Sequence, residues 1–227
     1  GHLPAARELY KTVLARQTAD GHVAARTFGD VARVAFAQKR YRDAQAMYIN
    51  GLQAQPRSAA LLTGLAKSLQ ALGQGSRARA ALAKALDAAP DHAPAWLGLG
   101  QLELEERRYR VAMAHLRRAL ELDPTLNEAL GGLATAAKAT GGEAAEQQAL
   151  AYRVQLRSLS PNDVSNLVAL SRLMAKRDPH GALALLRSAL RVTPGHPHAS
   201  FELAVLLAEQ ASDGVQAGVD EAREIAL

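Results

Sequence analysis

The 227-residue chain contains no cysteine, which excludes disulfide bonds, thiol catalysis and cysteine-ligated zinc. This absence leaves the compartment open, because both the cytoplasm and the periplasm of a bacterium tolerate a cysteine-free chain. No run of about 18 apolar residues occurs, so the sequence predicts no membrane-spanning helix. No signal peptide is recognisable, and Gly1 and His2 are interpreted as a cloning remnant.

Aromatic residues are also scarce, at 4% of the chain, although apolar residues of all kinds make up 48%. This composition is typical of helices that pack through alanine and leucine, and no segment shows a β-strand pattern. The net charge of +5 raises the possibility of nucleic-acid binding. Single-stranded nucleic acid, however, needs aromatic side chains on which its bases stack. Nucleic acid is therefore disfavoured as a partner.

Residue patterns typical of enzymes are missing too. His196 and His198 form the only close histidine pair, whereas a zinc site needs three or four ligands at defined spacing. We interpret this pair as loop or capping residues. No glycine-rich phosphate loop follows a strand, and no Ser/His/Asp order is recognisable. The sequence therefore predicts no catalytic residue, no metal site and no cofactor.

What the sequence does contain is a pattern that recurs every 34 residues, marked by Pro56, Pro90 and Pro124. Residues 93–126 show it most clearly, as two helical segments with apolar stripes. Small residues recur where helices would approach closely, and bulky residues recur where the gap is wide. Two amphipathic helices cannot bury both stripes alone, so the copies must stack on one another. The marker residues of this copy are Trp96, Leu99, Gly100, Ala112, Leu116, Ala119 and Pro124.

This order of residues resembles the tetratricopeptide repeat (TPR), a helix–turn–helix of 34 residues. The resemblance covers nearly the whole chain and implies an all-α fold, a right-handed α-solenoid of antiparallel helix pairs known as a TPR superhelix. Residues 1–24 are predicted to hold the tag remnant and the second helix of a partial repeat. Five repeats and a truncated sixth are predicted to follow, at residues 25–58, 59–92, 93–126, 127–163, 164–196 and 197–227.

The fourth predicted repeat departs from the pattern. Pro161 follows Pro124 by 37 residues, so we expect an insertion of about three residues and a longer second helix. Arg153 falls where the pattern has a bulky apolar residue. Asn162 and Asp163 are expected to cap the next helix. Because the first and last repeats each lack a complete helix pair, we expect the chain to be part of a longer array.

The resemblance also implies a binding site, because in similar proteins first-helix positions line a concave groove. Here these positions are mainly basic or polar, and Glu202 and Glu209 reverse the charge near the C-terminal end. The groove is expected to take an extended or helical, acidic segment of a partner protein, and the alternative is a partner that contacts the convex face. The predicted groove residues are Arg26, Arg33, Lys67, Gln70, Gln101, Thr135, Lys138 and Arg172.

One TPR subclass binds the C-terminal carboxylate of chaperones through a Lys/Asn clamp, but Gly29 and Arg33 stand at those positions here. Chaperone binding is therefore disfavoured. The expected function is a non-catalytic protein–protein interaction scaffold within a larger bacterial assembly, secretion or envelope-biogenesis protein. Two alternatives remain open. The chain could be the substrate-docking region of an enzyme such as a glycosyltransferase, or a scaffold that self-associates through exposed terminal helices.

Overall fold

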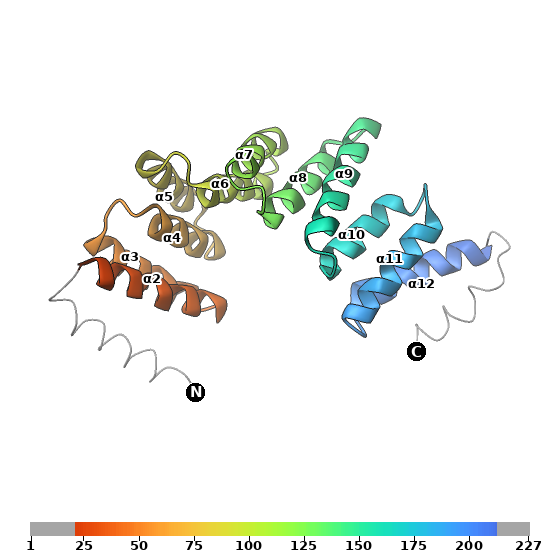
Figure 1. The fold of residues 1–227 in the computed structure, drawn as a ribbon, viewed down its shortest axis with the longest axis horizontal. Helices are drawn as coiled ribbons and strands as arrows, with labels where there is room; N and C mark the ends of the chain where they lie inside the picture. The colour runs from red at the N-terminus through yellow and green to blue at the C-terminus, as the bar shows by residue number, and fades with distance from the viewer. Residues whose placement is uncertain (1–20, 213–227) are drawn as a thin grey trace. The chain divides into compact units, whose positions relative to one another are not determined.

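The computed structural model describes residues 21–212, and within this range the chain forms eleven α-helices, α2 to α12, and no strand (Figure 1). The helices predicted within residues 3–17 and 221–227 lie outside the described residues. The chain divides into two compact units at Pro124, which we call unit 1 and unit 2. No helix within residues 21–212 combines the length and the apolar character that crossing a membrane requires.

Unit 1 contains three helix pairs that stack in chain order. The second helix of one pair contacts the first helix of the next, through α3 and α4 and again through α5 and α6. The first helices are α2 (Gly21–Ala37), α4 (Ala59–Ala71) and α6 (Ala93–Glu105). The second helices are α3 (Tyr41–Ala54), α5 (Gly75–Ala88) and α7 (Tyr109–Leu122).

Unit 2 contains two helix pairs and one further first helix. The pairs are α8 (Asn127–Thr140) with α9 (Glu143–Leu159), and α10 (Val164–Met174) with α11 (Pro179–Val192); α12 (Pro197–Ser212) packs against α11. Helix α9 has 17 residues, whereas α7 and α11 have 14 each. The additional residues lengthen the helix that connects α8 to α10.

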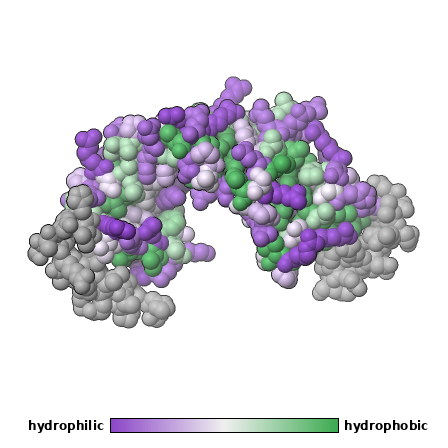
Figure 2. Space-filling model, in the orientation of Figure 1, coloured by the Kyte–Doolittle hydropathy of each residue, from purple (hydrophilic) through white to green (hydrophobic). Residues whose placement is uncertain are grey.

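The core of each unit lies where small and large side chains meet between helices. Ala112, Leu116 and Ala119 of α7 are completely buried. A Cβ atom at Gly100 of α6 would lie 2.6 Å from the Cγ atom of Leu116, so the glycine is what allows this leucine to pack against α6. Hydrophilic side chains cover most of the visible surface of each unit, with smaller hydrophobic areas between them (Figure 2).

Trp96, the single tryptophan of the chain, lies at the edge of this core and is half-buried. Its indole Nε1–H donates a hydrogen bond of 2.8 Å to the Pro90 carbonyl oxygen, and its ring centroid lies 5.5 Å from that of His115. Burial lowers the pKa of His115, an effect that the charge of Glu103 opposes. The indole therefore fastens the start of α6 to the preceding turn and to α7.

Side-chain caps define the starts of several helices. Asp163 accepts a hydrogen bond of 3.0 Å from the backbone N–H of Asn166 at the start of α10, which confirms its predicted capping role; Asn162 lies outside the cap. Asp178 caps α11 in the same way. The Nδ1 atom of His196 accepts a hydrogen bond of 3.2 Å from the backbone N–H of Ala199, so the predicted capping role of this histidine is confirmed.

The turns that follow α2, α4 and α6 share one backbone conformation. Lys39, Gly73 and Arg107 stand 34 residues apart and have φ angles of 61°, 73° and 58°. After α6, for example, the N–H of Arg107 bonds to the Leu104 carbonyl and the N–H of Arg108 bonds to that of Glu103. Such turns favour glycine, because a side chain in the left-handed region costs about 1–2 kcal/mol.

The Arg107→Gly and Lys39→Gly variants are therefore expected to stabilise unit 1 by about 1 kcal/mol each, since glycine adopts these φ angles without strain. Urea denaturation followed by circular dichroism measures the change. The matched control is Arg117→Gly, at an exposed position inside α7, which should cost about 1 kcal/mol. Equal destabilisation by all three substitutions would contradict the prediction.

Candidate functional site

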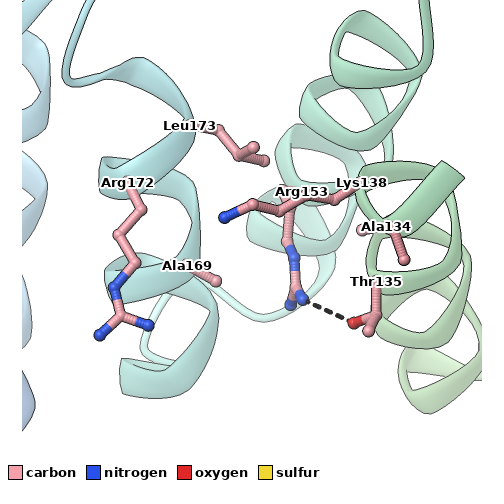
Figure 3. A pocket seen from close by; sticks show the side chains of 8 residues that line it. Ala134, Thr135, Lys138, Arg153, Ala169, Arg172 and Leu173 are labelled. Carbon is pink, nitrogen blue, oxygen red and sulfur yellow. Dashed lines mark hydrogen bonds between the residues drawn. The ribbon is translucent and has the colours of Figure 1, made fainter. Parts of the chain in front are cut away.

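A cavity of about 460 Å³ opens in unit 2 where α8, α9 and α10 meet (Figure 3). We call it the basic groove, because three of its side chains are cationic and come from three different helices. The remaining lining is one hydroxyl group and four small or apolar side chains. The lining residues are Ala134, Thr135, Lys138 and Ala139 of α8, Arg153 of α9, and Ala169, Arg172 and Leu173 of α10.

Helical spacing explains why α8 presents Thr135 and Lys138 to this groove. Leu133, Ala136 and Ala137 are completely buried and form the packed side of the helix. Thr135 and Lys138 are three residues apart, so they lie one above the other on the exposed side. Lys138 extends from α8 toward α10, and its ammonium group forms no ion pair with residues 21–212 (Figure 3).

Arg172 occupies the opposite wall, on α10, with its guanidinium group turned toward α12. There it pairs with Glu202, at 2.6 Å from its Nη2 atom and 2.7 Å from its Nε atom. Arg172 is exposed, so its remaining donors reach solvent at the groove. The pair with Glu202 cancels much of its charge, as the sign reversal expected near the C-terminal end of the sequence suggested.

Arg153 approaches the groove from α9 and points between the other two helices (Figure 3). Its guanidinium donates only to neutral oxygens, at 3.3 Å to the Thr135 hydroxyl and at 3.5 Å to both the Gly131 carbonyl and the Asn166 side chain. These contacts are long for hydrogen bonds between nitrogen and oxygen. No carboxylate among the described residues forms an ion pair with it.

Burial lowers the pKa of Arg153, and the charge of Asp163 only partly opposes this effect. The group nevertheless stays protonated, because an arginine in a protein does not lose its proton at physiological pH. The groove therefore combines a partly desolvated cation, an exposed lysine and a second arginine with a single paired carboxylate. Such an arrangement attracts an anionic ligand.

Of the eight groove residues that the sequence predicts, the structure brings Thr135, Lys138 and Arg172 together in the basic groove. The other five are spread over three helices of unit 1, and two of them contact acidic residues. Arg33 pairs with Asp30 of its own helix, and the Gln70 side chain donates a hydrogen bond of 2.8 Å to Glu105. The five residues are Arg26 and Arg33 on α2, Lys67 and Gln70 on α4, and Gln101 on α6.

Sequence reasoning identified Arg153 as an irregularity but did not assign it to the site, because only first-helix positions were considered. It also missed Asn166, which is completely buried beside Arg153. The signal was available, since both residues are polar where other repeats are apolar. The described residues contain no cluster of three or more side chains of the kinds that bind metal ions.

Three comparisons with known proteins were made, and two of them agree on the family. The tetratricopeptide repeat family matches residues 63–127 and 168–225, more than half of the chain. No curated protein sequence matches. Among solved structures, pilF of Pseudomonas aeruginosa is 20% identical, with a TM-score of 0.75, over 91% of this chain and 89% of that one. TTC0263 of Thermus thermophilus is 17% identical, with a TM-score of 0.67, over 81% and 99%.

A third similar structure is YrrB, described as a TPR protein with an unusual peptide-binding site. It is 20% identical, with a TM-score of 0.56, over 76% of this chain and 88% of that one. At these identities the likeness shows the fold alone, which is the all-α fold of TPR solenoids. Together with the repeat pattern and the stacked helix pairs, the match over more than half of the sequence shows that this chain belongs to the tetratricopeptide repeat family.

Proposed function

We propose that this chain is a non-catalytic scaffold whose basic groove binds an acidic segment of a partner protein. TPR proteins generally act as protein-interaction scaffolds, and the similar YrrB has a peptide-binding site. The observation that carries the proposal is the convergence of Lys138, Arg153 and Arg172 on one cavity. Within the described residues, only Glu202 forms an ion pair with any of the three. Excess positive charge in a concavity favours a ligand of opposite sign.

The lining also supports a peptide rather than a small anion. Ala134, Ala139 and Ala169 keep the walls short, so a backbone can approach the helices, and Leu173 offers an apolar contact beside the charges. A segment that alternates acidic and apolar side chains would use both kinds of surface. We also propose that the chain serves in a bacterial assembly, secretion or envelope-biogenesis protein, in keeping with its likeness to bacterial TPR proteins.

The test is binding of a fluorescent peptide of alternating Glu and Ala residues, blocked at both ends, measured by anisotropy. The Lys138→Glu/Arg172→Gln variant is expected to weaken binding at least about tenfold, because it removes two attractive charges and introduces one repulsive charge. Glutamine is chosen at position 172 so that no carboxylate is placed against Glu202. Higher salt should weaken binding to the original protein more than to the variant.

The matched control is Lys176→Glu, which reverses an exposed cation of unit 2 that does not line the groove. It should change affinity less than about twofold, since a distant rim charge is screened. A peptide in which lysine replaces glutamate should not bind. Equal losses for the groove variant and the control would mean that only net charge matters, and unchanged affinity in the groove variant would exclude this site.

A further inference from the structure

Arg153 occupies a position that is part of the apolar core in the other repeats. It stands eight residues before Pro161, the proline that closes its repeat. The same position, eight residues before each of the other closing prolines, holds a bulky side chain that is almost completely buried. These side chains are Tyr48, Leu82, Leu116 and Leu186.

Asn166 departs from the pattern in the same manner. It stands five residues after Pro161 and is 0% exposed. The residues five positions after the other closing prolines are apolar and also buried. They are Leu61, Ala95, Ala129 and Ala199. Two core positions have therefore become polar at one place in the array.

The two polar residues contact each other. The Nδ2 atom of Asn166 donates a hydrogen bond of 3.0 Å to the backbone carbonyl of Arg153, and the Arg153 Nη1 atom lies 3.5 Å from the Asn166 Oδ1 atom. Gly131, which has no side chain, leaves space on α8, where a Cβ atom would lie 3.9 Å from Nη1. Asn166 and Gly131 thus hold the guanidinium at the floor of the groove.

Packing alone does not account for this pair. A partly buried guanidinium without a counter-ion lowers stability, and an apolar side chain at the same place would pack without that cost. The five N–H donors of Arg153 have three long contacts to neutral oxygens. The arrangement leaves strong donors available to an oxyanion that enters the groove.

We infer that Arg153, positioned by Asn166, is the receptor for the carboxylate of one acidic side chain of the bound segment. The inference rests on the proposed function and names the anchoring contact within it. An arginine fork binds a carboxylate through two parallel, charge-assisted hydrogen bonds. Lys138 and Arg172 stand on either side, on α8 and α10. Three cations on three helices suit a segment with several carboxylates better than a single chain terminus.

The Arg153→Leu/Asn166→Ala variant tests this inference, because it restores the residue types of the other repeats at both positions. We expect the melting temperature to rise by a few degrees while affinity for the blocked Glu/Ala peptide falls at least about tenfold. Arg153→Lys should lie between the two proteins in affinity, since it keeps the charge and loses the fork. Asn166→Ala alone should weaken binding by a smaller factor, because it frees the guanidinium to move.

The outcomes separate this inference from the proposed function. If the Lys138→Glu/Arg172→Gln variant loses affinity and the double apolar variant does not, the receptor role of Arg153 is wrong and the groove stands. If neither loses affinity, both proposals fail. Circular dichroism establishes that each variant is folded, and Arg153→Lys provides the comparison if the apolar variant is not.

Two further peptides test the chemistry of the ligand. One carries its only carboxylate at a free C-terminus, and the other replaces glutamate by phosphoserine. Weak binding of both, unaffected by Arg153→Lys, supports a receptor for acidic side chains. Arg153-dependent binding of either peptide that exceeds that of the Glu/Ala peptide would overturn the assignment.

Discussion

Replacing Arg79 and Arg108 together by methionine is expected to destabilise unit 1 by about 3–5 kcal/mol. Both guanidinium groups pair with the carboxylate of Glu103, which is almost completely buried on α6. The Nε atom of Arg108 lies 2.5 Å from Oε2 of Glu103, and Arg79 bonds to Oε1. Without the two arginines, a buried negative charge has no counter-ion. Urea denaturation followed by the fluorescence of Trp96, the single tryptophan, reports on this unit.

The reverse substitution should cost much less. Glu103→Gln removes the buried charge and leaves two arginines that are about one-third and one-half exposed and still face Glu106. Adding Glu103→Met to the double arginine variant should restore most of the lost stability, because an apolar side chain needs no partner. Equal losses for Glu103→Gln and for the double arginine variant would show that the asymmetry between buried and exposed partners is absent.

The same cluster predicts opposite pH responses. Burial favours the neutral form of Glu103, but Arg79 and Arg108 outweigh this and hold the pKa of its carboxyl below the usual range. Its contribution to stability is therefore present above the unfolded-state pKa of about 4.3 and is lost as the pH falls through the lower folded-state pKa. In the double arginine variant burial acts alone and should raise that pKa. Mild acidification below neutral pH should then partly restore the stability of the variant.

Leu82→Arg is expected to destabilise unit 1 by at least about 4 kcal/mol. Leu82 is almost completely buried and stands at the position that Arg153 occupies in its own repeat. The residues that accommodate Arg153 have no counterparts there. Ala95 takes the place of Asn166, and Lys67 stands two periods before Thr135. A guanidinium at position 82 would lack these acceptors and would meet a basic residue.

The control for this prediction is Leu82→Met, which keeps the side-chain volume and should cost less than about 1.5 kcal/mol. Denaturation followed by Trp96 fluorescence measures both variants. If Leu82→Arg were tolerated as well as Leu82→Met, arginine would be acceptable at this position in any repeat. The polar surroundings of Arg153 would then carry no special meaning.

The all-α fold could be predicted because its signals are local. A stripe of apolar residues at helical spacing needs only its own segment to be recognised, and the closing prolines repeat that pattern along the chain. Individual caps such as Asp163 were predictable for the same reason, since the capped N–H lies three residues away. The 37-residue spacing between Pro124 and Pro161 likewise pointed to a longer helix before the structure placed α9.

The site was less predictable, because charge along a sequence does not show which charges are already paired. Arg33 is paired with Asp30, Arg172 with Glu202, and Arg108, interpreted from the sequence as a solvated turn residue, with the buried Glu103. Arg153 belongs to a second helix, outside the positions that usually line a groove. Its approach to α8 depends on the missing side chain at Gly131 and on the amide of Asn166, which come from other helices.

By itself, the sequence determined the helices and the family, because a 34-residue period of apolar positions has one economical solution, the stacking of helix pairs. Only the tertiary structure decided which cations meet in one cavity and which are neutralised. Ion pairs form between side chains that helix packing brings within a few ångströms, whatever their separation in sequence, and Arg172 and Glu202 are 30 residues apart.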